Sequence, residues 1–141
     1  MNEEAKPILR NKMESARAAL SSEEHKQKSE LICDRAKELF FIPLICAKQQ
    51  RPVIFTYMPF RKEIDLLPLI EWLWEMECSV LVPKTNPSSN TMQLFRVSSM
   101  TELELGTWGI PEPASHAHPW DEDLDIAVMI VPGIAFDRAG G

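Results

Sequence analysis

The sequence predicts a single α/β domain over residues 1–141, in which a mixed, mostly parallel sheet is flanked by helices in a Rossmann-like layered sandwich. Apolar residues first recur at helical spacing through the N-terminal third of the chain. Two short apolar runs then flank a further helical stripe, and a last apolar run covers residues 126–131. Strand, helix and strand in succession predict a parallel unit, because the helix carries the chain back across the sheet.

Two helices are expected in the N-terminal third. The first contains residues 8–20, and Ser21 and Glu24 then form the spacing of a capping box. The second is expected over residues 22–40 and should end before Pro43. Its buried face is predicted to comprise Ile32, Ala36, Leu39 and Phe40.

A strand and a helix should follow. The proline-bounded run at 52–59 is rich in β-branched and aromatic residues, which predicts a strand. Asp65 is then placed to cap a helix whose first turn contains Pro68, where no amide partner is needed. The helix has an apolar stripe that comprises Leu66, Leu69, Ile70, Leu73 and Met76.

The second half of the chain predicts further strands. A buried strand at 79–82 is expected to end at Pro83, and the alternating pattern of 91–97 predicts a half-exposed strand. Residues 102–108 fit neither pattern, and residues 109–125 are expected to form a long proline-rich loop. The continuous apolar run at 126–131 is typical of a strand that is covered on both faces.

Composition excludes several classes of function. The chain has 141 residues, of which 45% are apolar and 26% are charged. This apolar fraction is large enough to form a buried core. Its formal charge of −6 argues against nucleic acid or an anionic membrane as a partner. The first residues lack the apolar core of a secretory signal, and no apolar run approaches the roughly 18 residues of a membrane span. The three cysteines are far apart and odd in number, which favours free thiols in a cytoplasmic protein over a disulfide framework or a zinc site.

Two positively charged residues near the N-terminus are candidate phosphate ligands. Lys6 and Arg10 are four residues apart, so both project from one face of the first helix. A guanidinium and an ammonium together can hold a di- or triphosphate. By spacing alone, a solvated helix face explains the pair better.

A second candidate site lies where the first strand ends, because ligands of open α/β sheets bind beyond the carboxyl ends of the strands. Glu63 follows this strand and has Tyr57 and Phe60 as near neighbours in sequence. A carboxylate among aromatic rings can accept hydrogen bonds from an amino-heterocycle that stacks on them. A glutamate that only stabilises the start of the next helix is an equal alternative. Lys84 and the residues from Pro132 onward should lie at the same edge.

The remaining clusters of polar residues give weaker evidence for a functional site. His116 and His118 precede three acidic residues, Asp121, Glu122 and Asp123, which are metal-ligand types, but an exposed acidic loop is the better interpretation. His25 is most simply a residue of the helix surface. The chain has no nucleophile elbow, paired-cysteine motif or Walker sequence, and no catalytic residue can be assigned.

Several segments together resemble the 5-formyltetrahydrofolate cyclo-ligase (methenyltetrahydrofolate synthetase) family. In order along the chain these are "KPILR" with Lys6 and Arg10, "LSSEE", "YMPFRKEID", "LVPK", "GIPEP" and "VPGIAFD". Each motif is weak by itself, but the ordered set covers nearly the whole chain.

The resemblance implies an ATP- and magnesium-dependent ligase that converts 5-formyltetrahydrofolate to 5,10-methenyltetrahydrofolate and releases ADP and phosphate. ATP would phosphorylate the formyl oxygen, N10 would attack the activated carbon, and phosphate would leave. The residues of "KPILR" would bind ATP, and they are Lys6, Pro7, Ile8, Leu9 and Arg10. Met58 and Glu63, with Tyr57 and Phe60 beside them, would bind the folate.

The family pattern continues with a glycine-rich segment that binds phosphates and supplies an aspartate to magnesium, and this chain ends at Gly140–Gly141. We therefore expect a domain truncated at its C-terminal end, with the metal ligand beyond Gly141, that is inactive alone. Two alternatives are a non-catalytic folate- or nucleotide-binding paralogue and a sugar-phosphate isomerase-like α/β enzyme.

Overall fold

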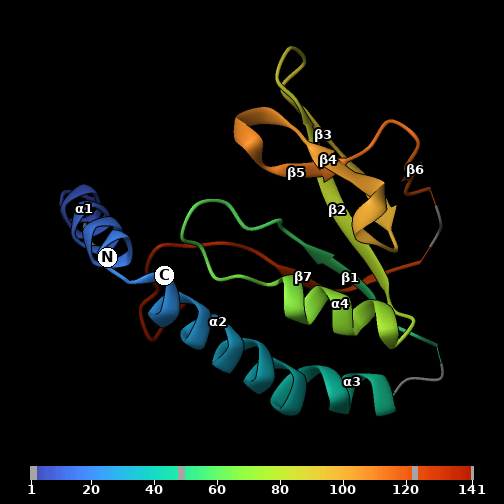
Figure 1. Cartoon of the computed structure of the whole chain (residues 1–141), viewed down its shortest axis with the longest axis horizontal. Coiled ribbons are helices and arrows are strands. Elements are labelled where there is room, and N and C mark those ends of the chain that lie inside the picture. The colour runs from blue at the N-terminus through green and yellow to red at the C-terminus, as the bar shows by residue number, and fades with distance from the viewer. Residues whose placement is uncertain (1–2, 48–49, 122–123, 141) are drawn as a thin grey trace.

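The computed structural model describes residues 3–47, 50–121 and 124–140, and its centre is a five-stranded sheet (Figure 1). The strands lie in the order β6-β3-β2-β1-β7. Their bounds are His118–Pro119 for β6, Thr91–Val97 for β3, Ser79–Asn86 for β2, Val53–Thr56 for β1 and Ile126–Ile130 for β7. A separate two-stranded sheet pairs β4, Leu103–Leu105, with β5, Pro111–Pro113.

The directions of the strands confirm the predicted fold class. β1 pairs in parallel with both β2 and β7, whereas β2 with β3 and β3 with β6 are antiparallel. Within this sheet, β3 therefore runs against the other four strands. The carboxyl ends of β1, β2 and β7 meet at one edge, which is where an open α/β sheet binds its ligands.

Three helices, α2, α3 and α4, cover one face of the sheet, and α1 does not (Figure 1). The helices are α1, Ala5–Ala18; α2, Ser22–Ala36; α3, Ile42–Ala47; and α4, Leu67–Glu75. A π-helical turn, η1, Lys37–Phe41, joins α2 to α3. Among the described residues, no helix has both the length and the apolar character that a bilayer span requires.

The main core lies between α2, α3, α4 and the sheet. Ile54 and Val80 of the sheet pack in one cluster with Cys33, Phe41 and Leu73 of the helical layer, and all five are at most 3% exposed. The predicted stripe of α4 is confirmed, since its residues Leu69, Ile70 and Leu73 are buried.

The opposite face of the sheet has a smaller cluster. Val53, Phe55 and Leu81 are buried there, with Trp120 partly buried against them. The strand expected to be covered on both faces, β7, is instead half-exposed, and its Met129 is 60% exposed. This correction has a simple reason: β7 is an edge strand of the sheet, and the helices lie on the other face.

The helix did not end before Pro43 as predicted. Pro43 lies in the first turn of α3, where a residue needs no amide partner. The π turn immediately before it changes the hydrogen-bond pattern, and the amide of Ile42 bonds to the carbonyl of Lys37. The helical rod therefore continues to Ala47.

The predicted buried face of this rod was also largely wrong. Ile32, Leu39 and Phe40 are 42%, 75% and 51% exposed, and of the four predicted residues Ala36 alone packs against the core. Ser29 and Cys33 are buried instead. A search for apolar residues overlooks Ser29, and the extra residue of the π turn shifts the face so that Phe41 rather than Phe40 points inward.

The strand predicted to end at Pro83 continues to Asn86. β1 pairs with β2 no further than Leu81, so at Pro83 there is no ladder on that side for the missing amide to interrupt. The predicted loop at 109–125 contains β5 and β6. The ambiguous residues 102–108 contain β4 and the first two residues of the short helix η3, Thr107–Gly109. β4 and β5 have three residues each and β6 has two, which is too few to show an alternating pattern in the sequence.

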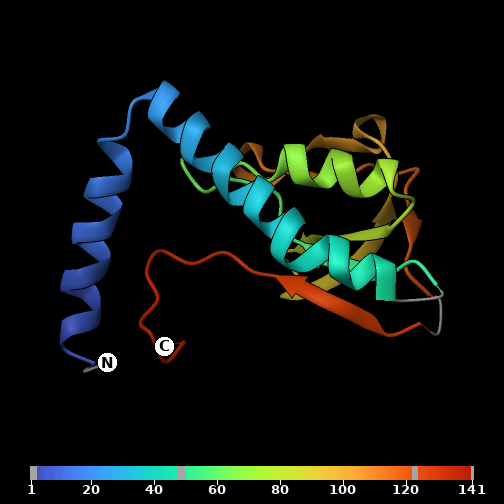
Figure 2. The same cartoon turned by 90° about the horizontal axis from the view of Figure 1, so that it is seen from below.

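Helix α1 forms where predicted, but it stands beside the rest of the molecule (Figure 2). No residue of α1 is buried, and Ile8 of its apolar stripe is 72% exposed. At the start of α2, the amide of Glu24 donates to Ser21 Oγ at 3.1 Å, which confirms this part of the predicted capping box. The chain then turns into α2, which returns to the sheet.

Candidate functional site

The loop between β1 and α4, residues 57–66, lies at the carboxyl edge of the sheet. Because β1, β2 and β7 are parallel, their carboxyl ends bring this loop, Lys84 of β2 and the segment after β7 to the same edge. Lys84 is half-buried there and donates from Nζ to the carbonyl of Pro113 at 3.2 Å. We call residues 57–66 the edge loop.

Glu63 closes the edge loop on itself. Its Oε1 accepts a hydrogen bond from the amide of Phe60 at 2.8 Å, and its own amide donates to the carbonyl of Phe60 at 3.2 Å. Arg61 lies between them at a φ of 56°, with its guanidinium 4.9 Å from the centre of the Phe60 ring. The carboxylate of Glu63 is thus held in place, half-buried, before any ligand binds.

The phenol of Tyr57 lies in the field of this carboxylate. Burial, and secondly the negative charge of Glu63, raises the pKa of Tyr57 to about 12. Its hydroxyl donates to the carbonyl of Ile64 at 3.5 Å, a long contact. At neutral pH the ring therefore presents a neutral donor beside an anionic acceptor, which suits a planar ligand with both donor and acceptor groups.

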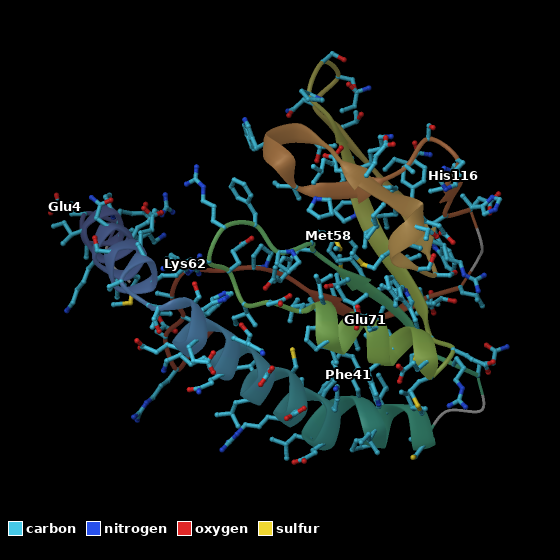
Figure 3. The ribbon with its side chains drawn as sticks, in the orientation of Figure 1. Glu4, Phe41, Met58, Lys62, Glu71 and His116 are labelled. Carbon is cyan, nitrogen blue, oxygen red and sulfur yellow. The ribbon has the colours of Figure 1, made fainter. Side chains whose placement is uncertain are left out.

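Met58 has a different position from the other three predicted folate contacts. It is 5% exposed and belongs to the main core cluster, whereas Tyr57, Phe60 and Glu63 are only half-buried. Figure 3 places Met58 near the centre of the molecule. Met58 therefore attaches the start of the edge loop to the core.

The far end of the edge loop is fixed by α2. The amide of Asp65 donates to the buried Ser29 Oγ at 3.0 Å, and Cys33 Sγ donates to the carbonyl of Asp65 at 3.4 Å. Asp65 Oδ1 in turn accepts from the amide of Leu67, the first residue of α4, at 3.0 Å. The N-cap position itself is Leu66, one residue after the Asp65 that the sequence predicted, and it has no side-chain cap. Burial raises the pKa of the Cys33 thiol, so this sulfur remains a neutral structural group.

The predicted ATP residues lie apart from the edge loop. Lys6, Pro7, Ile8 and Arg10 are exposed on α1, Leu9 is half-buried, and Lys6 Nζ is 2.6 Å from Glu3 Oε1. Figure 3 shows the neighbouring Glu4 at one end of the molecule, whereas Met58 lies near its centre. The described structure therefore does not bring the two predicted binding segments into contact.

The edge loop contacts α1 at the C-terminal end of this helix, away from Lys6 and Arg10. Lys62 of the edge loop donates from Nζ to the carbonyls of Ala18, at 2.8 Å, and Leu20. Figure 3 shows Lys62 between the loop and α1. Next to it, His25 Nε2 bonds to the carbonyl of Glu63 at 2.7 Å. His25 is therefore half-buried between α2 and the loop, which corrects its prediction as a residue of the helix surface.

Two cavities border this junction. One, of about 330 Å³, lies between α1, α2, the edge loop and the segment after β7, and has apolar walls from Met13, Ile32 and Ile134 with Lys28 and Lys62 beside them. The other, of about 390 Å³, is lined by Glu14, Arg17, Ala18, Arg61 and Lys62. Neither cavity is lined by Met58 or Glu63.

The histidine-rich segment gives no metal centre within the described residues. No three His, Cys, Asp or Glu side chains gather there in an arrangement that could hold an ion. His116 and His118 are exposed, as is Asp121, while Glu122 and Asp123 lie outside the described residues. His118 belongs to β6, so the segment is not purely a loop, and the expected acidic loop is tested only at the exposed Asp121.

Sequence reasoning missed the contacts of Lys62 and His25. Lys62 and Ala18 are 44 residues apart, and His25 and Glu63 are 38 apart, so no periodicity links either pair. The one available signal was local, because the cationic Lys62 directly precedes the predicted folate ligand Glu63.

The fold and the edge loop define an α/β protein whose candidate ligand site lies at the carboxyl edge of a mostly parallel sheet. A sequence model of the 5-formyltetrahydrofolate cyclo-ligase family matches residues 2–141, which is nearly the entire chain. The chain belongs to this family.

Two relatives agree with that assignment. A probable 5-formyltetrahydrofolate cyclo-ligase of Schizosaccharomyces pombe is 34% identical over 87 residues, which are 60% of this chain and 42% of that protein. The NMR structure of Aquifex aeolicus 5,10-methenyltetrahydrofolate synthetase superposes with a TM-score of 0.72 and 34% identity, over 94% of this chain and 63% of that one. The chain thus spans less than two thirds of the length of either relative.

Proposed function

We propose that this chain supplies the folate-binding loop and the first ATP contacts of an enzyme that converts 5-formyltetrahydrofolate to 5,10-methenyltetrahydrofolate, with release of ADP and phosphate. Family membership supports the reaction class, and the names of the two relatives support the substrate. The observation that carries the proposal is the fixed carboxylate of Glu63, beside Tyr57 at the ligand-binding edge of the sheet.

Glu63 would bind the donor edge of the pterin. Its Oε1 already accepts from the amide of Phe60, and a carboxylate has further lone pairs for a second donor. Tyr57 and Phe60 would supply the flat walls against which the heterocycle stacks. Met58 would act indirectly, because its buried side chain keeps the loop in register with β1.

Lys6 and Arg10 would bind the phosphates of ATP, with Pro7, Ile8 and Leu9 between them. Both cations are exposed on one side of α1, so both can reach an anionic ligand. ATP, when bound, supplies the phosphoryl group that makes the formyl oxygen a leaving group. We assign magnesium to no residue of this chain. Within the described residues, no three His, Cys, Asp or Glu side chains gather in an arrangement that could hold an ion.

The same proposal includes three expectations about the chain. Residues 1–141 form a single domain that does not turn over substrate alone, because the sequence pattern of its five glycines, at positions 106, 109, 133, 140 and 141, is not that of a phosphate loop. The protein acts in the cytoplasm, where its free cysteines stay reduced. Its partners are small molecules, since the acidic surface disfavours nucleic acid.

An absorbance assay tests the proposed reaction. The full-length protein is incubated with 5-formyltetrahydrofolate, ATP and magnesium, and formation of methenyltetrahydrofolate is followed with and without ATP. We expect turnover that requires ATP, and none from residues 1–141 at the same concentration. A full-length protein that binds the folate but forms no product would instead be a binding paralogue.

A further inference from the structure

Helix α1 is held to the molecule by few contacts. It has no buried residue, and its predicted ATP ligands lie on the exposed surface. A 14-residue helix is close to the length at which isolated helices are only marginally stable in water. The position of α1, and therefore of Lys6 and Arg10, must depend on the contacts at its ends.

Lys62 provides contacts at the C-terminal end of α1. Its ammonium donates to the carbonyls of Ala18 and Leu20, which lie at and just beyond the last turn. These carbonyls are the groups that a helix leaves without an internal partner, and the negative end of the helix dipole favours a cation there. The side chain is half-buried, which limits its screening by solvent.

Lys62 also belongs to the loop that carries the proposed folate ligand. It directly precedes Glu63, whose carbonyl is held by His25 and whose carboxylate is held by the amide of Phe60. The backbone from which Lys62 projects is therefore fixed. Near the same end of α1, Arg17 Nη2 donates to the carbonyl of Gly133 in the segment after β7, at 3.0 Å.

We propose that Lys62 is a positioning residue that fastens the ATP-binding helix to the folate-binding loop. The inference rests on the proposed function for the roles of α1 and Glu63, but the attachment itself rests on the geometry of Lys62. Without its ammonium, α1 pivots on the short connection to α2, and Lys6 and Arg10 lose their fixed place relative to the folate.

Enzyme kinetics test the consequence for ATP. In the full-length enzyme, Lys62→Met keeps the length and apolar stem of the side chain and removes its donor. We expect a KM for ATP raised about three- to tenfold, the range that a cation at a helix C-terminus supplies. The affinity for the folate and the melting temperature should change little, and Lys62→Arg should restore most of the ATP effect.

The matched control is Lys28→Met. Lys28 lines the same cavity as Lys62, so its loss changes the local charge by the same amount. We expect a normal KM for ATP in this variant. An equal rise in both variants would mean that charge near the cavity, and not the attachment of α1, affects ATP, and the inference would be wrong.

Hydrogen exchange of residues 1–141 tests the attachment without any activity. Lys62→Met should speed the exchange of amides in α1 about three- to tenfold, while amides of α4 keep the wild-type rate. Unchanged exchange in α1 would overturn the inference. Faster exchange in a protein whose full-length form shows no ATP-dependent turnover would support the attachment and overturn the proposed function.

Discussion

Helices α1 and α4 are both amphipathic in sequence, yet only α4 is part of the core. Leu69, Ile70 and Leu73 of α4 are at most 1% exposed, whereas no residue of α1 is buried and its Ile8 is 72% exposed. Topology explains the difference: α4 connects the parallel neighbours β1 and β2 and must cross the sheet, while α1 precedes α2 and has no such constraint.

The comparison separates stability from ligand binding. The residues that hold the fold together lie on α2, α3, α4 and the strands beneath them, and the predicted ATP residues lie on the loosely held α1. The edge loop combines both kinds of residue, since Met58 is part of the core while Glu63 is half-buried. Substitutions in α4 should therefore lower the stability of the fold, whereas substitutions in α1 should change ATP binding and leave stability almost unchanged.

The largest effect is expected in α4. Leu73→Ala removes a fully buried side chain next to Ile54 and Val80 and should lower the free energy of unfolding by about 2–5 kcal/mol. Urea denaturation measures this change. In α1, Ile8→Ala should cost less than about 0.5 kcal/mol, because the side chain is exposed. Comparable losses in the two helices would show that α1 packs more tightly in solution than described.

A smaller effect is expected where α2 holds the edge loop. Ser29→Ala removes the acceptor for the amide of Asp65 at a site where the serine is 3% exposed. The buried amide is left without its partner, so the free energy of unfolding should fall by about 1–3 kcal/mol. The exposed Ser15 of α1 is the control, and Ser15→Ala should leave the urea midpoint almost unchanged.

The third prediction concerns alkaline pH. The pKa of Tyr57 in the folded protein is about 12, above its usual value near 10. As pH rises from 10 to 12, the unfolded chain loses this proton first, so the folded state loses stability across that window. Urea midpoints at pH 9 and pH 11 should therefore fall less in Tyr57→Phe than in the wild type. Equal falls would mean that Tyr57 is solvated in the folded state.

The smallest effects on stability are expected at the predicted ATP residues. Lys6→Ala and Arg10→Ala should each change the free energy of unfolding by less than about 0.5 kcal/mol, because both side chains are exposed. In the full-length enzyme both should raise the KM for ATP. A clear drop in melting temperature with normal ATP kinetics would make them structural residues of α1.

Local patterns predicted most of the regular elements. The stripe of α4, the strand before the edge loop and the cap at Ser21 all follow from neighbouring residues, and the structure confirms them. The errors have physical causes that extend beyond a local window. Pro43 fits the helix because a π turn precedes it, and Pro83 fits β2 because β1 has already ended beside it.

The candidate site was less predictable than the fold. Glu63 was found because it follows a strand end among aromatic residues, and the same residues gave the family resemblance. Its hydrogen bond to the amide of Phe60 could not be foreseen, nor could the contacts of Lys62 with the end of α1. These depend on loop geometry and on residues that are distant in sequence.

The central claim is that Glu63 binds the folate rather than merely closing its own loop. Glu63→Gln separates the two roles, because the amide oxygen can still accept from the amide of Phe60 while the charge is lost. Calorimetric titration of 5-formyltetrahydrofolate into the full-length protein measures the affinity, with the exposed Glu71→Gln in α4 as control. We predict that Glu63→Gln weakens folate binding by about 1.5–3 kcal/mol with an unchanged melting temperature, and that Glu71→Gln has no effect. Unchanged folate affinity in Glu63→Gln would contradict the account, and would leave Glu63 as a residue that only shapes the loop.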